Sequence, residues 1–504
     1  GNAALSVSTG DLLINSVDRI EFSPAQRVAL KPLGRQVILR ENRNMGFDGR
    51  VFAGLTVFEG KDFHFNYDRF TIRMDSARYF DLFIATGEED RMGNPVALSI
   101  ASRIEHVAGS LIIDAPQNKA TRSDIPIFPS FHSSAPSFVY YDSPSTMEGC
   151  YGRDSFFFQI DPFHFYGLDN YTREDVAFLG SIVSAEIFPD IPETLRLQED
   201  ESLGVQTATP DTGLAIYQGK GLYTGAMDLS NQGFLGKGNL NYLGTSIFSD
   251  DFIFKPKELL CSAEEFNLDE DRGDPEYPKA YGQDVLINWR PYKDSMYIRS
   301  AEFPFDLFAE PGYTLDGTLI LTPLALRANG VLEWPLARLT SEVMSTGAYS
   351  VQADSALIEI KSLQDPDKVA LANNNVRADI DFDEGYGEFE AREGKVVTEL
   401  PNNQYQTSMN AFDWDIPAEQ VIFRTAEDSL SEFLSVDPNR DSLLFQGKTA
   451  GYNLRTNELQ IGGVPYVISC DALIYPDSGE VVIESGGQMR TLDSARIIAS
   501  LENK

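Results

Sequence analysis

The sequence predicts an all-β fold, an elongated stack of short strands with few helices, from three observations. Aromatic residues make up 11% of the 504 residues, together with 39 Gly and 26 Pro, which is typical of strands joined by tight turns. Short runs that alternate apolar and polar residues occur along the whole chain, whereas helical periodicity is scarce. Related segments also recur, which favours a β-solenoid or β-jellyroll-like repeats, with a run of independent β-sandwiches as the alternative.

The N-terminal β region, residues 1–132, shows the alternation clearly. Its best example is the run Phe63, Phe65, Tyr67, Phe70, Ile72 and Met74. A second β region, residues 133–208, begins in a segment rich in Ser and Pro and ends before the turn-forming sequence Thr-Pro-Asp-Thr-Gly. Apolar strands resume directly beside both segments, so we interpret them as exposed loops rather than flexible linkers.

Residues 209–300 form a β repeat unit, and residues 301–375 are its second copy. At an offset of 92 residues without a gap, the two align over at least 25 residues. The aligned pairs are Gly225 and Gly317, Phe234 and Leu326, Gly238 and Gly330, Leu240 and Leu332, Tyr242 and Trp334, Ile247 and Leu339, and Ser249 and Ser341. A unit of this kind buries its apolar face by stacking on the next one.

A shorter signature, Asp-Ser-Ala, begins at Asp75, Asp354 and Asp493, with a looser copy at Asp471. An Asp side chain can close a turn by bonding its own backbone, and a small residue then fits a tight corner. We therefore expect each copy to be a turn that opens a strand.

The C-terminal β-stack region covers residues 376–504. Residues Val376 to Asp383 alternate almost perfectly, which predicts a strand with one buried face. Seven short strands are expected after it, at 442–445, 451–454, 458–461, 466–469, 472–475, 480–483 and 495–498. The clearest helix candidate of the whole chain is a short piece near Ala426 to Leu434.

The chain carries 41 basic and 76 acidic side chains, hence a formal charge of −35 at pH 7. Non-specific binding to nucleic acid is excluded, because it requires clustered Lys and Arg, and an acidic field repels phosphate. No run reaches the roughly 18 to 20 apolar residues of a membrane helix, so we expect no transmembrane helix. The sequence begins Gly1-Asn2-Ala3 without a leader, which suggests a processed chain or a fragment.

Local signatures of catalysis are missing. The histidines, His64, His106, His132 and His164, lie far apart in the sequence, and we interpret each as an imidazole on a strand face. The segment Gly447-Lys448-Thr449 resembles the end of a phosphate loop, but Ser442 stands where its first glycine belongs, so we expect a hairpin turn. The cysteines, Cys150, Cys261 and Cys470, have no metal or redox spacing and are expected to be buried apolar residues. We assign no catalytic and no cofactor-binding residue.

One acidic run is a candidate for a bound ion. Asp379, Asp381 and Asp383, with Glu390 at the twelfth position, have the ligand spacing of a helix-loop-helix calcium loop. The sixth position is Glu384, where that loop requires Gly, and the aspartates alternate with apolar residues as on a half-buried strand. Structural calcium is therefore one hypothesis, and a plain strand is the alternative. A second acidic run at 267–274 lacks the distal Glu and is interpreted as a solvated loop.

Four segments are distinctive: Gly109 to Lys119, Phe178 to Pro189, Glu199 to Gly204 and Asp228 to Gly233. They resemble parts of large uncharacterised exported envelope proteins of the Bacteroidota, and the resemblance covers most of the chain. It implies export, a place in the periplasm or at the outer membrane of a Gram-negative cell, and a longer parent chain. It supplies no catalytic residue.

The segment 472–483, Ala-Leu-Ile-Tyr-Pro-Asp-Ser-Gly-Glu-Val-Val-Ile, is similar to a rung of the OstA-like periplasmic domains. Those domains carry lipopolysaccharide in a slot between stacked strands. The similarity covers about 60 residues of the C-terminal region and bears on the fold more than on function.

These observations lead us to expect a non-enzymatic structural or assembly component of a Gram-negative envelope that binds other envelope proteins. Calcium is the single cofactor considered, and lipid or glycan are further candidate partners. The alternatives are a carbohydrate-binding or polysaccharide-processing β-helix protein, and a lipid carrier with an apolar slot between stacked strands. A polysaccharide enzyme needs Lys or Arg beside acids on successive rungs, whereas the basic residues are scattered singly.

Overall fold

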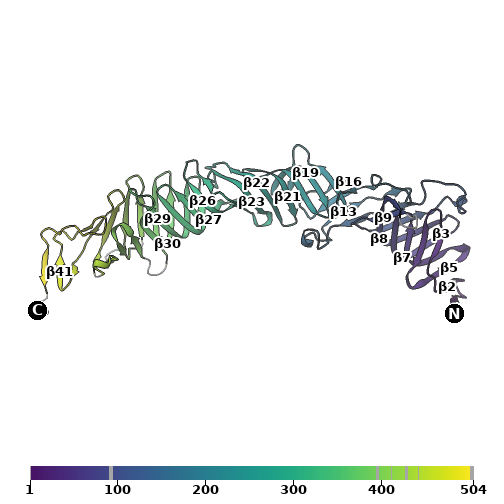
Figure 1. Ribbon diagram of the computed structural model, residues 1–504, viewed down its shortest axis with the longest axis horizontal. Helices are drawn as coiled ribbons and strands as arrows, with labels where there is room; N and C mark the ends of the chain where they lie inside the picture. Colours follow the sequence, from purple (N-terminus) through teal and green to yellow (C-terminus); the bar gives the residue numbers. More distant parts are fainter. Residues whose placement is uncertain are drawn as a thin grey trace. The chain divides into compact units, whose positions relative to one another are not determined.

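The computed structural model describes residues 2–89, 95–392, 397–409, 411–425, 429–440 and 442–499, which form strands joined by turns and single turns of 3-10 helix (Figure 1). The chain divides into two compact units, the first comprising residues 1–240 and 250–259 and the second residues 241–249 and 260–504. Within each unit the predicted all-β class, with stacked strands and few helices, is confirmed. This division is coarser than the predicted regions and does not test their boundaries. No helix in the described part of the chain is long and apolar enough to cross a membrane.

Long bent strands form the centre of the first unit: β6 (Met45–Ala53), β7 (Thr56–Asn66), β8 (Thr71–Glu89) and β10 (Ile104–Ile112). In β8 the buried side chains are Ile72 and Met74 before Asp75-Ser76, and Ala77 after it. The β8–β10 pairing shifts by one residue at the same place, so Asp75-Ser76 forms a β-bulge. A bulge bends a strand, and the two halves of the outer long strands β6 and β10 pair with different short strands.

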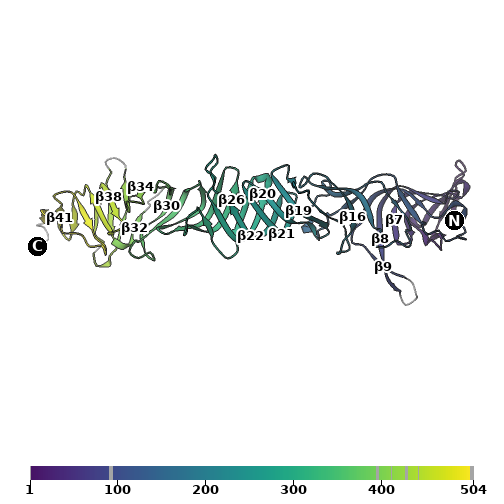
Figure 2. The same ribbon diagram turned by 90° about the horizontal axis from the view of Figure 1, so that it is seen from above.

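The short strands of the first unit extend two antiparallel ladders from these halves. Ladder 1 contains β1 (Ala3–Leu5), β2 (Leu12–Asn15), β5 (Gln36–Leu39), β11 (Ser130–Ser133) and β14 (His164–Phe165). Ladder 2 contains β3 (Ile20–Ser23), β4 (Val28–Pro32), β12 (Ser137–Tyr140), β13 (Phe156–Ile160), β15 (Ala177–Ser184), β16 (Ile191–Leu197) and β17 (Leu203–Ala208). The second half of β8 pairs with β9 (Pro95–Ser99), which projects from the rest of the first unit in Figure 2.

Further strands follow in the sequence. β17 pairs with β19 (Gly221–Ser230), which also pairs with β18 (Leu214–Ile216) and β20 (Gly233–Tyr242). They are followed by β21 (Thr245–Lys255), β22 (Glu258–Leu268), β23 (Ala280–Arg290), β24 (Ser295–Ser300) and β25 (Phe305–Leu307).

The second unit repeats the bent-strand principle in β26 (Thr314–Thr322), β27 (Ala325–Trp334), β28 (Ala337–Thr346), β29 (Ser350–Lys361) and β30 (Val369–Asp381). In β29 the buried side chains change phase from Val351 and Ala353 to Ala356 and Ile358, and Asp354-Ser355 is the bulge between them. The prediction that the Asp-Ser-Ala signature opens a strand is therefore wrong at Asp75 and Asp354. It is correct at Asp493 and for the looser copy at Asp471, which lie in turns directly before strands.

At β30 the sheet divides into two antiparallel ladders of short strands. Ladder 3 continues from its second half through β31 (Tyr386–Ala391), β34 (Ala411–Asp415), β35 (Gln420–Arg424), β38 (Thr449–Asn453), β39 (Glu458–Gly462) and β42 (Val481–Ile483). Ladder 4 continues from its first half through β32 (Thr398–Leu400), β33 (Tyr405–Thr407), β36 (Ser431–Ser435), β37 (Leu444–Gly447), β40 (Val467–Ser469), β41 (Ala472–Tyr475) and β43 (Arg496–Ala499). The chain alternates between the two ladders, usually after each hairpin, so both close over one interior.

Several local predictions need correction. Gly447-Lys448-Thr449 is not a hairpin turn, because it crosses from β37 in ladder 4 to β38 in ladder 3. The helix expected near Ala426 to Leu434 is wrong over its described part, where Ser431 to Leu434 belong to β36, while Ala426 lies outside the described residues. Cys470 is exposed in a turn, whereas Cys261 is buried as expected.

Glycines at the bend allow neighbouring strands to approach closely. Gly330 in β27 has a φ of +120°, and a β-carbon there would lie 2.2 Å from the backbone oxygen of Asp316 and 2.8 Å from the α-carbon of Gly317. In the β19–β20 hairpin, Gly225 and Gly238 make the same close approach. A side chain at this position would push the two bent strands apart.

The variant Gly330→Ala is expected to lower the free energy of unfolding by about 2–3 kcal/mol, because it combines overpacking with an unfavourable φ. Urea unfolding followed by tryptophan fluorescence reports on the second unit, which holds Trp289, Trp334 and Trp414. The control is Gly451→Ala, where the nearest atom to the added β-carbon is 3.9 Å away. Equal unfolding midpoints for the two variants would contradict the close-approach argument.

Candidate functional site

The four acids predicted as calcium ligands lie at the β30–β31 hairpin and make separate contacts. Asp379 Oδ2 accepts a hydrogen bond from Gln352 Nε2 at 3.0 Å, and Asp381 Oδ1 accepts one from the backbone N–H of Glu384 at 2.9 Å. Asp383 Oδ2 lies 2.8 Å from Arg272 Nη1. Glu390 stands opposite Arg377 in the β30–β31 pairing.

This arrangement confirms the strand interpretation, since Ala378 and Ile380 are buried and Asp379 is exposed between them. Across the described residues, no three His, Cys, Asp or Glu side chains are grouped as metal ligands. The calcium hypothesis therefore gains no support from the geometry and remains a prediction. One of these acids, Asp383, contacts a larger structural feature, the seam between the two ladders.

The seam is the line along which the turns of ladder 3 face the turns of ladder 4. On the ladder 3 side the turns are β26–β27, β28–β29, β30–β31 and β38–β39, and on the ladder 4 side they include β27–β28 and β32–β33. The bulges lie on the opposite side, where the strands bend. The apolar interior is thus enclosed by backbone at the bend and by side chains at the seam.

An aromatic cluster fills one stretch of the seam. Phe308, Tyr313 and Trp334 come from the ladder 4 side, and Tyr349 and Phe382 come from the turns of ladder 3. Phe382 contacts Phe308, Tyr313 and Trp334 with ring centroids 5.2 to 5.5 Å apart. Edge-to-face packing of this kind excludes water from the interior. Trp334 is therefore core, not an exposed ring for stacking on sugars.

An acidic strap, residues 269–279, lies over this cluster. The strap leaves the ladder 4 side between β22 and β23 and contacts three successive turns of ladder 3. The Tyr277 hydroxyl donates to the backbone oxygen of Thr322 at 2.8 Å, and Glu276 Oε2 accepts from the N–H of Ala348 at 3.1 Å. Arg272 makes the third contact, with Asp383, and also bonds Glu270 at 2.6 Å.

The electrostatics of the strap centre on Arg272. The hydrogen bonds that its guanidinium donates to Glu270 and Asp383, with the charges of these acids, raise the pKa of Arg272 above the usual value. Beside the strap is a polar hollow lined by Asp274, Glu276, Ser345, Thr346 and Gln352, among others. The second acidic run of the sequence is therefore a bridge across the seam and not simply a solvated loop.

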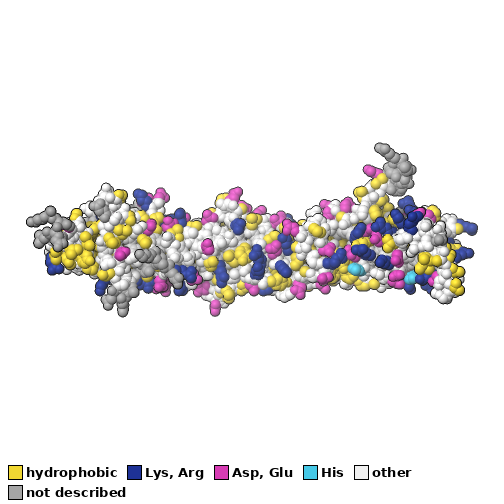
Figure 3. Space-filling model, turned by 90° about the horizontal axis from the view of Figure 1, so that it is seen from below, with side chains coloured by type: hydrophobic (Ala, Val, Ile, Leu, Met, Phe, Trp, Pro, Cys, Tyr) yellow, Lys and Arg dark blue, Asp and Glu magenta, His cyan; other side chains and the backbone are white. Residues whose placement is uncertain are grey.

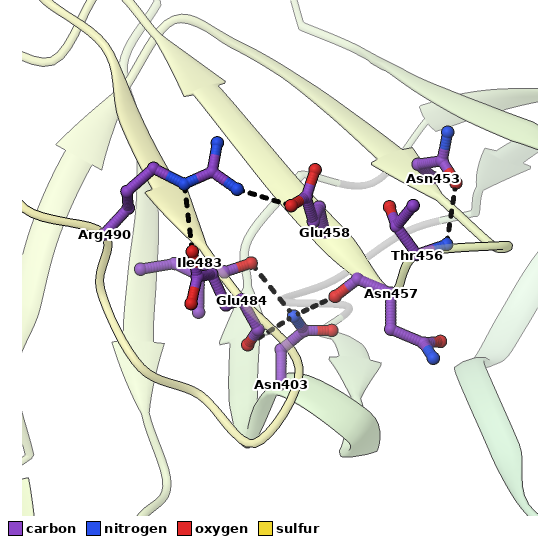
Figure 4. A network of polar contacts seen from close by, with 8 residues as sticks. All are labelled: Asn403, Asn453, Thr456, Asn457, Glu458, Ile483, Glu484 and Arg490. Carbon is purple, nitrogen blue, oxygen red and sulfur yellow. Dashed lines mark hydrogen bonds and ion pairs between the residues drawn. The ribbon is translucent and has the colours of Figure 1, made fainter.

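A buried amide closes the next stretch of the seam (Figure 4). Asn403, in the β32–β33 turn of ladder 4, is fully buried. Its Nδ2 donates to the backbone oxygens of Asn457 at 2.8 Å, Ile483 at 3.2 Å and Glu484 at 3.2 Å, all from the ladder 3 side. Arg490 bonds both Glu458 and Glu484 at the surface of the same network. We call this set of bonds the Asn403 latch.

The seam residues hold the ladders together. Asp383, Asp379 and Glu276 at the seam bond an Arg, a Gln and a backbone N–H group, respectively. Sequence reasoning missed the strap and the latch, because their partners are 45 to 111 residues away along the chain. The Pro401-Asn-Asn-Gln404 turn was the local signal that could have drawn attention to Asn403.

Comparison with protein-family models finds no match to this chain, and comparison with curated proteins finds none either. The resemblance to envelope proteins therefore stays an expectation, and function is argued from the structure.

The strap should loosen in the variant Arg272→Gln, which removes the ion pairs with Asp383 and Glu270. Because exposed ion pairs are worth about 0–1 kcal/mol, the unfolding midpoint should change little. Hydrogen exchange at the amides of Asp271 and Tyr277, which bond each other across the strap, should accelerate several-fold. Arg338→Gln, which breaks ion pairs outside the strap, is the control and should leave these amides unchanged. Unaltered exchange in R272Q would mean that Tyr277 and Glu276 suffice to hold the strap.

Removing the latch should cost more, because it takes the side-chain donor away from three backbone carbonyl groups, of which that of Glu484 keeps the N–H of Gly487. Asn403→Ala is expected to lower the free energy of unfolding of the second unit by about 1–3 kcal/mol in urea titrations. Asn374→Ala, at an exposed position of β30, should have almost no effect. Asn403→Asp places a carboxylate against carbonyl oxygens, so its pKa should rise and the variant should be less stable at neutral than at acid pH. A latch variant as stable as the Asn374 control would refute the role of Asn403.

Proposed function

We propose that the chain is a non-enzymatic, exported structural or assembly component of a Gram-negative envelope, which binds other envelope proteins. The observation that carries this proposal is the open apolar edge of ladder 4. Among the described strands β43 pairs only with β41, and its side chains Ile497 and Ile498 are 63% and 46% exposed.

Neighbouring side chains enlarge this edge surface. Ile468 of β40 and Tyr466 beside it are also largely exposed. Figure 3 shows apolar side chains gathered at the end of the second unit where the C-terminal strands lie. An exposed strand edge with apolar side chains is a template for the addition of a further strand. We therefore propose that a strand of another envelope protein extends ladder 4 at β43.

A lipid carrier is the second candidate, and one observation favours it. Ladders 3 and 4 enclose an apolar interior, and along the seam only side chains and the strap separate that interior from solvent, as the Phe382 cluster and the Asn403 latch show. Opening the seam would expose an apolar slot. The polysaccharide-processing alternative has less support, because the seam arginines Arg272 and Arg490 are each already paired with two acids.

The test is capture of the protein from its native envelope after mild crosslinking, with mass spectrometry of what accompanies it. Defined outer-membrane or secretion components should be recovered. The amount recovered should fall several-fold with the variant Ile497→Lys, because an edge lysine blocks strand addition. Val343→Lys is the matched control, since Val343 is 60% exposed on β28, away from the edge. Recovery of lipid or glycan without a protein partner would overturn the assembly proposal and favour the carrier.

A further inference from the structure

Three of the four histidines, which are far apart in sequence, lie in one cross-strand row of ladder 1. The pairing registers place Gly46, His64, Arg73, Ser110, His132 and His164 directly opposite one another on β6, β7, β8, β10, β11 and β14. Neighbouring strands lie about 4.8 Å apart, so the row presents a cationic or ionisable group at nearly every strand.

The row faces outward. The residues that alternate with it, Phe63, Phe65, Ile72, Leu111 and Phe131, are buried, so the row itself is on the opposite face of the sheet. Arg40 extends the row at one end, with Nη1 3.3 Å from His64 Nδ1, and covers Gly46. Tyr166 closes the other end, with its hydroxyl 3.2 Å from His164 Nδ1.

His132 and His164 form a parallel pair with ring centroids 4.3 Å apart and an angle of 7° between the planes. Burial, and then the proximity of His164, lower the pKa of His132, and its Nε2 is buried without a hydrogen-bond partner. The lone pairs of parallel rings point side by side, so they do not converge on one metal ion at about 2.0–2.1 Å. Stacked imidazoles can instead interact with an anion at the outer face of the sheet, through ring N–H groups other than the buried Nε2 of His132.

The charge distribution along the chain singles out the same region. Residues 1–122 hold 15 basic and 15 acidic side chains, so the other 26 basic and 61 acidic side chains produce the whole net charge of −35. Figure 3 shows Lys and Arg side chains gathered over the first unit, with histidines among them. An anion therefore meets a locally neutral to positive surface here.

The surroundings of the row carry both signs of charge. On the side toward the bulges lie Asp48, Asp62 and Asp75, of which Asp75 pairs with Arg73 at 3.0 Å. On the side toward the β7–β8 turn, Arg43 and Lys119 lie over the Tyr67 ring at 4.9 and 5.2 Å, with Arg69 in the same turn and Glu41 beside Arg40. Acids therefore lie on both flanks, but on the second flank Glu41 and Asp68 are accompanied by the three cations Arg43, Arg69 and Lys119.

From this geometry we propose that the row from Arg40 to His164 is a binding site for a phosphate monoester. The guanidiniums of Arg40 and Arg73 supply positive charge, and the stacked imidazoles of His132 and His164 supply N–H donors. Without a ligand, the lowered pKa of His132 means that the unfolded chain binds its proton first, so folding stability declines as pH falls below about 6.5. A bound phosphate removes this penalty, because it stabilises the charged imidazoles.

The experiment measures binding to the whole chain at about pH 5.5 and about pH 7.5 with two probes. Glucose 1-phosphate tests a soluble phosphate monoester by calorimetry, and vesicles of phosphatidylcholine with phosphatidic acid test the same group on a lipid surface by sedimentation. The affinity for at least one probe should be about tenfold higher at the lower pH. Phosphate monoesters lose charge over this range, since their second pKa is about 6, so any gain must come from the protein. The probe that binds identifies the source of the phosphate.

Variants separate this site from general electrostatic attraction. The double variant His132→Gln, His164→Gln should lose the pH dependence, and Arg73→Gln should weaken binding several-fold at both pH values. Arg19→Gln is the matched control, because Arg19 is 58% exposed against 62% for Arg73 and also pairs with an acid two residues further on. The proposal would be overturned if neither probe bound at the lower pH. It would also be overturned if the double variant kept the same pH dependence of binding as the unaltered chain. Neither result bears on strand addition at β43, so the two proposals can fail separately.

Discussion

The β-bulge in the middle of each long strand is the constraint on which the rest of the structure depends. At Asp75-Ser76 and Asp354-Ser355 one extra residue shifts the alternation, so that apolar side chains before and after the bulge still face one interior although the strand has bent. The two halves of a bent strand then start two ladders, which short strands extend. A flat sheet of the same sequence would expose half of these side chains to water.

A fold closed by bending on one side must be closed by side chains on the other. Strands cannot supply hydrogen bonds across the seam, because the turns of the two ladders meet there end to end. The chain instead uses an aromatic cluster around Phe382, a strap tied by Tyr277 and Arg272, and the amide of Asn403. The backbone ladders are cooperative and continuous, whereas these contacts are few and local. We therefore expect the seam to open at a lower free-energy cost than the bend.

The sequence predicted the local structure well and the non-local structure poorly, for a physical reason. Alternation and turn residues are local signals, and they located the short strands after residue 442 to within about two residues, whereas the alternation from Val376 found only the second half of β30. Partners in a ladder are not local. Lys448 therefore looked like a hairpin turn although it joins two ladders, and Asp383 looked like a calcium ligand although Arg272, 111 residues away, is its partner. His64, Arg73 and His132 became neighbours only when the registers were known.

Net charge illustrates the same limit. A charge of −35 excludes non-specific binding of nucleic acid, because such binding needs cations spread over an extended surface. It does not exclude an anion site of a few groups, because at physiological ionic strength charges more than about 8 Å away are largely screened. What a ligand experiences at ladder 1 is set by Arg40, Arg73 and the charged side chains on both flanks of the row. A strongly acidic chain can therefore carry a local cationic row, and whether it does depends on strand register rather than on composition.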